Sequence, residues 1–199
     1  MVYTVLYYRN TVRQEDSPMT EKAQIMDGAT LNRTVARISH EITERNHGVA
    51  DLCILGVKRR GVPLARRICD YLNDFEGERV PLGELDITYQ RDDLDDEGKR
   101  AAATGSEIPC DLTDKTVIIV DDVLYTGRTA RASIDTVFRY GRPRSVQLVT
   151  LVDRGHRELP IRPDYVGKNV PTSKSETVSV RFEELDGETG VYICEGDGK

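Results

Sequence analysis

The chain has 199 residues, a length typical of one domain, and a formal net charge of −6 at pH 7. Apolar residues make up 38% of it and 16 glycines add to that share, which is enough for a core and excludes wholesale disorder. The negative charge argues against a general nucleic-acid coat, although a local basic patch can still attract RNA.

Membrane and zinc classes are also disfavoured. The longest aliphatic run, residues 117–120, is far shorter than the roughly 20 residues of a membrane span. The N-terminus lacks a charged-then-apolar signal pattern, so we expect a cytoplasmic protein with no membrane partner. The four cysteines, at positions 53, 69, 110 and 194, form no C-x-x-C pair, which argues against a zinc knuckle or a disulfide scaffold.

The first half of the chain predicts alternating helices and strands. Residues 1–24 give no clear pattern and are treated as an N-terminal extension, with residues 25–199 as a single domain. Thr30 is the expected N-cap of the first helix, in which apolar side chains recur every three or four residues. The predicted elements are a helix over 31–46, a strand over 51–57, a helix over 61–74, a strand over 80–89 and a polar loop or lid over 90–103.

The second half continues the alternation. Its predicted elements are a strand over 116–120, a helix over 128–140, a strand over 145–152 and later strands over 177–182 and 191–194. Strands alternating with helices predict an α/β domain whose central sheet is mainly parallel and flanked by helices.

The most informative segment joins the strand at 116–120 to the helix at 128–140. Two adjacent carboxylates, Asp121 and Asp122, stand where the β-branched strand ends, and ligands bind beyond such ends. Thr126-Gly127-Arg128-Thr129 then opens the helix, whose N-terminus suits a phosphate. The carboxylates would repel that phosphate, so they should serve ribose hydroxyls or a bound magnesium ion. The spacing disfavours the alternative, an acidic helix entrance without a ligand, and no Walker loop occurs.

This segment resembles the phosphoribosyl-diphosphate (PRPP) signature of the type I phosphoribosyltransferases. The resemblance implies that the two acids hold the ribose hydroxyls of PRPP, that the Thr-Gly-Arg-Thr loop surrounds its 5′-phosphate, and that Mg²⁺ is held mainly through PRPP. It also implies the family's fold, with a small hood and a flexible loop. The implied PRPP-binding segment comprises Val117, Ile118, Ile119, Val120, Asp121, Asp122, Val123, Leu124, Tyr125, Thr126, Gly127, Arg128 and Thr129. Purine-using members commonly have an aspartate where Tyr125 stands, so Tyr125 argues against a purine substrate.

Further stretches, together spanning about residues 25–182, lie at residues 37–42, 56–61, 85–94, 151–162 and 166–176. They resemble a subgroup that combines uracil phosphoribosyltransferase activity with regulation of pyrimidine operons. The resemblance implies that a basic turn binds pyrophosphate, that residues 88–103 form the catalytic loop with Arg91 as its best-placed cation, and that residues 152–161 form the hood over the base. The implied pyrophosphate turn is Lys58, Arg59, Arg60 and Gly61; in the family a threonine more often stands at Arg59. The implied base-binding residues are Val152, Asp153 and Arg154.

An RNA-binding face is a second expectation. Arg33, Arg37 and His40 form a stripe on the 31–46 helix, opposite its apolar residues, with Glu44 on the same stripe. On the residues alone a solvated helix face is favoured. The resemblance implies instead a surface for pyrimidine-operon leader RNA, to which His156 and Lys168 also belong. Ala36 stands where the family often has a hydroxyl residue, which removes one possible RNA contact.

The expected function is therefore the synthesis of UMP and pyrophosphate from uracil and PRPP, joined to UMP-responsive RNA binding in transcription attenuation. The resemblance is compatible with a homodimer or a homotetramer. Two alternatives remain open: an RNA-binding regulator with little turnover, and a purine phosphoribosyltransferase.

Overall fold

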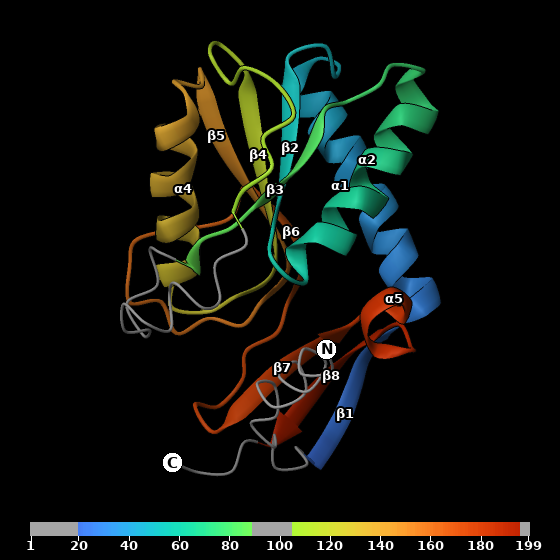
Figure 1. The fold of residues 1–199 in the computed structure, drawn as a ribbon. Coiled ribbons are helices and arrows are strands. Elements are labelled where there is room, and N and C mark those ends of the chain that lie inside the picture. Colours follow the sequence, from blue (N-terminus) through green and yellow to red (C-terminus); the bar gives the residue numbers. More distant parts are fainter. Residues whose placement is uncertain (1–19, 89–104, 196–199) are drawn as a thin grey trace, which may run out of the picture.

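The protein, seen here as a computed structural model that describes residues 20–88 and 105–195, contains two sheets (Figure 1). The helices are α1 (Gly28–Asn46), α2 (Gly61–Glu76), α4 (Arg128–Tyr140) and α5 (Glu183–Asp186). The strands are β1 (Thr20–Asp27), β2 (Leu52–Val57), β3 (Leu82–Leu85), β4 (Thr116–Leu124), β5 (Ser145–Asp153), β6 (Tyr165–Asn169), β7 (Glu176–Arg181) and β8 (Gly190–Glu195). Within the described ranges, no helix is long and apolar enough to cross a membrane.

The larger sheet has the strand order β3-β2-β4-β5-β6, and all of its strand pairs are parallel. Helices α1 and α2 cover one face and α4 covers the other (Figure 1). Strand β4 supplies both cores: Ile118 packs with the α1–α2 side, whereas Val117 and Ile119 pack with the α4 side. This alternation explains why the 117–120 run is apolar throughout, because both of its faces are buried. The predicted α/β fold is confirmed.

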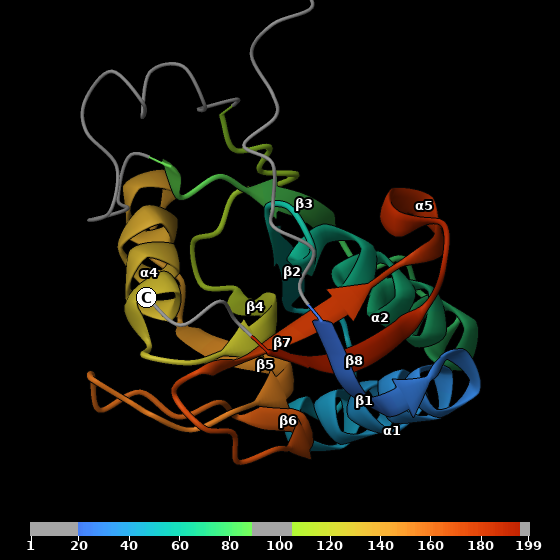
Figure 2. The same ribbon diagram turned by 90° about the horizontal axis from the view of Figure 1, so that it is seen from below.

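The smaller sheet has the order β1-β8-β7 and is antiparallel. It lies beyond the carboxyl ends of the parallel strands, where it stands below the larger sheet in Figure 1 and crosses it in the view from below (Figure 2). Strand β1 was not predicted, and it pairs with β8 from Thr20 to Asp27. The two late predicted strands, β7 and β8, are its other members.

Other details differ from the sequence-based expectation. Strand β4 continues past the expected end at residue 120 to Leu124, so Asp121 and Asp122 lie within the strand. The strand expected over 80–89 is only Leu82–Leu85, and β6 was not predicted at all. Helix α1 starts at Gly28, and its N-cap is Asp27, whose carboxylate accepts a hydrogen bond from the Thr30 amide at 2.7 Å. The expected N-cap, Thr30, is therefore the donor of the capping bond. An aspartate three residues earlier competes successfully because it is among the preferred N-cap residues.

Replacing Asp27 with alanine should lower the free energy of unfolding and the urea midpoint, because an amide of the first turn of α1 loses its acceptor. Asp27→Asn is the matched control, since asparagine caps helices about as well as aspartate. Urea denaturation of the three proteins measures both effects. An asparagine variant as unstable as the alanine variant would show that this cap does not stabilise the helix.

Candidate active site

Strand β4 delivers two acidic side chains to the edge of the sheet that faces the small sheet. Asp121 is only 7% exposed, Asp122 is half-buried, and the Asp122 amide donates to Asp121 Oδ1 at 3.0 Å. Burial raises the pKa of Asp121 well above its usual range, and the neighbouring Asp122 charge adds to this rise. Burial also raises the pKa of Asp122, against which the Arg60 charge acts. Two desolvated carboxylates side by side indicate a site kept for binding rather than for stability.

The turn after β4 has the geometry of an anion cradle. Gly127 adopts a φ of 93°, in the left-handed region, and is the N-cap of α4. The Thr126 carbonyl points toward the next loop, where it accepts bonds from the amides of Glu158 at 2.9 Å and Leu159 at 3.1 Å. The first amides of a helix have no partner within the helix, so the start of α4 suits a phosphate group.

Arg157 stabilises this turn through hydrogen bonds to its backbone, a role that was not predicted from the sequence. Its guanidinium donates to the Tyr125 carbonyl at 2.7 Å and to the Leu124 carbonyl at 3.4 Å, and it forms an ion pair with Asp153. The residues expected to cover the base thus also support the phosphate loop. No sequence signal indicated this role, because the acceptors are backbone oxygens.

The basic turn at 58–61 lies against β4 at Val120, immediately before the two acids. A Cβ on Gly61 would come within 2.3 Å of the Val120 carbonyl oxygen, so only glycine permits this approach. The turn thereby brings Lys58, Arg59 and Arg60 to the same edge as the two acids. Charge of both signs is concentrated there, which suits a diphosphate and a ribose held side by side.

The three cations of that turn differ in their surroundings. The Lys58 ammonium contacts the Gly105 carbonyl at 3.0 Å and the Glu84 carboxylate at 3.3 Å. The Arg60 guanidinium is engaged with the small sheet: it donates to the Val180 carbonyl at 2.6 Å and to Asp186 at 2.7 Å. Arg59 is exposed, and within residues 20–88 and 105–195 its guanidinium forms no ion pair. Its predicted role in binding pyrophosphate stays a prediction.

The predicted base-binding residues stand at the end of β5. Val152 is fully buried, and the Asp153 carboxylate accepts a bond from the Gly155 amide at 3.0 Å. Arg154 is only 6% exposed, and its guanidinium lies 4.1 Å from the Tyr125 ring centroid. The same guanidinium donates to Thr172 Oγ1 at 3.0 Å and to the Ser173 carbonyl at 3.1 Å.

These contacts, which engage Nε and Nη2 of the guanidinium, make Arg154 a support for the loop before β7. Burial lowers the pKa of Arg154 from its usual value, although the group remains a cation at neutral pH. Contact of Arg154 with a pyrimidine stays a prediction. His156 closes the same cluster: its Nε2 lies 2.6 Å from the Thr172 carbonyl, and its ring meets the Tyr125 ring edge-on at 5.9 Å.

The predicted catalytic cation, Arg91, lies outside the described residues. The two ends of its segment are described, and they meet at Asp86. This buried carboxylate accepts bonds from the amides of Thr88, at 2.9 Å, and Gly105, at 3.0 Å. Nothing in the sequence indicated that Gly105 binds Asp86, because the two residues are far apart along the chain.

Arg33, Arg37 and His40 are exposed on α1, as the helical spacing predicted, and Lys168 lies close to Arg37. Arg37 donates to the carbonyls of Val166 and Gly167, both at 2.8 Å, which places it beside Lys168 on β6. His156 is separate from this group and lies at the active site instead. Four of the five predicted RNA-binding residues, all except His156, therefore lie on one surface.

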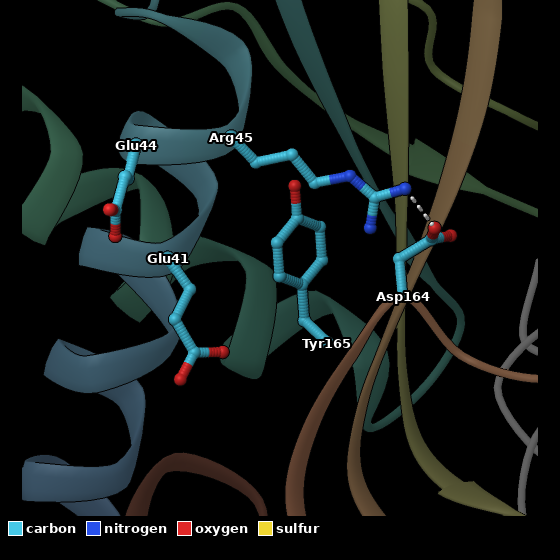
Figure 3. A pocket seen from close by; sticks show the side chains of 5 residues that line it. All are labelled: Glu41, Glu44, Arg45, Asp164 and Tyr165. Carbon is cyan, nitrogen blue, oxygen red and sulfur yellow. Dashed lines mark ion pairs between the residues drawn. The ribbon is translucent and has the colours of Figure 1, made fainter.

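A pocket of about 400 Å³ lies between α1 and the start of β6 (Figure 3). Arg45 stretches across it to an ion pair with Asp164 at 2.8 Å, with its guanidinium 5.5 Å from the Tyr165 ring centroid. Glu41 and Glu44 complete the lining. Since β6 begins at Tyr165, this pocket is at the amino ends of the parallel strands, away from the two acids of β4.

A parallel sheet, a pair of acids on its central strand and the open start of the next helix suit a sugar phosphate, and comparisons with known proteins identify the family. The model of the phosphoribosyl transferase domain matches residues 22–185. The chain belongs to the phosphoribosyltransferase family.

Within that family the chain falls among the PyrR proteins. It is 53% identical over 180 residues to the bifunctional protein PyrR of Thermus thermophilus, a match covering 90% of this chain and 99% of that protein. It is 55% identical over 177 residues to the bifunctional protein PyrR of Clostridioides difficile, covering 89% and 100%.

Solved structures support the fold. A hypoxanthine-guanine phosphoribosyltransferase from Bacillus anthracis superposes with a TM-score of 0.64 at 18% identity, covering 89% of this chain and 99% of that one. The hypoxanthine phosphoribosyltransferase of Trypanosoma cruzi gives a TM-score of 0.67, also at 18% identity, covering 89% and 98%. At this identity the match concerns the fold alone.

Asp121→Asn should make the protein more stable than the wild type at neutral pH. The folded protein binds the Asp121 proton more tightly than the unfolded chain does, so wild-type stability falls as the pH rises above the ordinary carboxyl value near 4. The asparagine keeps the oxygen that accepts from the Asp122 amide. Denaturant titrations between pH 4 and pH 8 measure the difference, which should shrink toward pH 4. Asp135→Asn, on the exposed side of α4, is the control. A destabilised Asp121→Asn protein at pH 8 would contradict the argument.

Proposed function

We propose that the protein transfers the phosphoribosyl group of PRPP to N1 of uracil, with release of pyrophosphate. The observation that carries the proposal is the meeting, at one sheet edge, of the Asp121–Asp122 pair, the start of α4 and the basic turn at 58–61. A 5′-phosphate, a ribose and a diphosphate are the three parts of PRPP, and each has a chemically suited partner there. Membership of the PyrR group supports the same assignment.

The reaction is a displacement at the anomeric carbon. Uracil N1 forms the new bond to the anomeric carbon and loses its proton to solvent, while the bond to pyrophosphate breaks and positive charge develops on the ribose. The carboxylates of Asp121 and Asp122 would hold the ribose hydroxyls and offset that charge, while the α4 start anchors the 5′-phosphate. Lys58 and Arg59 would receive the departing pyrophosphate. Positioning and fixed charge therefore supply the catalysis.

Magnesium fits this site only together with PRPP. Within the described ranges, no three histidine, cysteine, aspartate or glutamate side chains gather as a metal site, so the chain offers at most its acid pair. When bound with PRPP, the ion would neutralise the leaving pyrophosphate. Asp122 is the better placed of the two acids to contact it or the ribose, because it is less buried than Asp121.

The identity of the residue before the Thr-Gly pair favours a pyrimidine substrate over a purine. Tyr125, which precedes the Thr-Gly pair, has its ring enclosed by Arg154 and by the edge of His156. The chain thus has no carboxylate at this position to handle a purine-ring proton. A purine phosphoribosyltransferase is the alternative that this feature disfavours.

Activity is tested with PRPP, Mg²⁺ and each nucleobase in turn, by following pyrophosphate release. The wild type should produce UMP with uracil and little product with hypoxanthine or guanine. Asp122→Asn should lower kcat about a hundredfold or more while the melting temperature changes little, in line with the loss of one transition-state contact. Equal turnover of hypoxanthine would rule out the pyrimidine assignment, and unchanged kinetics in the asparagine variant would rule out the role of Asp122.

We further propose that the α1 face binds pyrimidine-operon leader RNA in response to UMP, as the second activity that the word bifunctional in the relatives' name suggests. Arg33 is exposed, with a single hydrogen bond to Thr30 at 3.0 Å, and Lys168 donates to the Ile25 carbonyl at 3.1 Å. The charged groups of both flexible side chains can turn toward phosphates. Arg37 is more committed, because it holds two β6 carbonyls and pairs with Glu41 at 2.5 Å.

Arg33→Ala and Lys168→Ala should each reduce the salt dependence of RNA binding by about 0.7–0.9 in log–log slope. Arg37 is left intact, because its replacement would also disturb the edge of the sheet. Filter binding of a leader hairpin at several salt concentrations, with and without UMP, provides the measurement. Arg131→Ala, an exposed cation on α4, is the matched control. Unchanged slopes, or an affinity indifferent to UMP, would contradict the regulatory assignment.

A further inference from the structure

His40 on α1 and Phe75 on α2 form a stacked pair of rings at the protein surface. Their ring centroids are 4.1 Å apart and their planes differ by 15°. Phe75 is 44% exposed, and His40 is exposed as well. Tyr71, one turn before Phe75, supports it from α2 at a centroid distance of 5.8 Å. The pair is thus a flat, preformed and water-facing aromatic surface.

The aromatic pair continues the basic stripe of α1. His40 lies about 20° around the helix from Arg33, and Arg37 lies about 40° to the other side. Phe75 therefore extends the stripe toward α2, while Lys168 extends it toward β6 through the contact of Arg37 with Gly167. Cations occupy one side of this surface and rings occupy the other.

The charges around the rings select the part of a nucleic acid that can lie there. Asp74 and Glu76 flank Phe75 and are exposed, and Glu44 lies one turn after His40. These carboxylates repel phosphate groups, so a backbone would run over Arg33 and Lys168 instead. A base has an uncharged π face and stacks on an aromatic ring whatever its identity. Unpaired bases of RNA loops are recognised in this way.

We propose that His40 and Phe75 form a stacking platform for one unpaired base of the bound RNA, with Phe75 holding the His40 ring flat. This inference rests on the proposed RNA binding and specifies what the surface reads: a loop or bulge nucleotide rather than a continuous duplex. Phe75 acts as a positioning residue as well as a contact.

The test compares two synthetic RNA hairpins with the same stem. One carries 2-aminopurine and other purines in its loop, and the second carries abasic nucleotides at the same positions. The wild type should bind the base-containing hairpin at least about fivefold more tightly and should quench the 2-aminopurine fluorescence. Phe75→Leu should abolish both the preference and the quenching, whereas Phe75→Tyr should retain them. Phe138→Leu, which alters another exposed phenylalanine, 54% exposed on α4, should behave as the wild type.

The outcomes separate this inference from the function on which it rests. If the wild type binds both hairpins equally and Phe75→Leu changes nothing, the platform is refuted while RNA binding stands. If the wild type binds neither hairpin even at low salt, RNA binding fails and the platform with it. Melting temperatures of the variants, which should stay close to that of the wild type, exclude unfolding as the cause of any loss.

Discussion

The close approach of the Gly61 backbone to the Val120 carbonyl is the constraint on which the site depends. A single added carbon at Gly61 would sit 2.3 Å from that oxygen, so the basic turn reaches β4 only because the side chain is absent. The acids and the start of α4 belong to the connection from β4 to α4, whereas the cations belong to the turn from β2 to α2, and this contact sets the spacing between the two groups. Arg60 then extends the link to the small sheet through the Val180 carbonyl.

The buried acid pair lowers the stability of the folded protein when its carboxyl groups are ionised. Asp121 and Asp122 are adjacent in sequence, which sends their side chains in different directions from one strand while leaving their charges close together. Burial and mutual repulsion both oppose ionisation of Asp121. A ligand that brings ribose hydroxyls, and a cation with its phosphates, relieves that opposition. Substrate binding therefore has a favourable electrostatic contribution that an apolar pair could not provide.

Much of this arrangement could be predicted from the sequence, because its signals are local. The run at 117–120, the two acids and the Thr-Gly-Arg-Thr turn define a strand, a binding edge and a helix start without reference to the rest of the chain. Helix α4 begins and ends at the predicted residues for the same reason. The exposed stripe on α1 follows from helical spacing alone.

The parts that escaped prediction depend on partners distant in sequence. Strand β1 is a strand because β8 pairs with it, and its own pattern of mostly exposed side chains gives no alternation to detect. Arg157 and Arg154 donate to backbone oxygens of other loops. The ring of Phe75 stacks on that of His40, which belongs to another helix. Such contacts leave no periodic trace in the chain.

The tie at Asp86 has a consequence for how this family can diversify. Because the amides of Thr88 and Gly105 both donate to one buried carboxylate, the two described residues that flank the segment 89–104 are held together beside β3. Insertions, deletions or exchanges within that segment would leave β3 and the acids of β4 in register. The hydrogen bonds to Asp86 thus make the geometry of the acid pair independent of the length of the chain that connects Thr88 to Gly105.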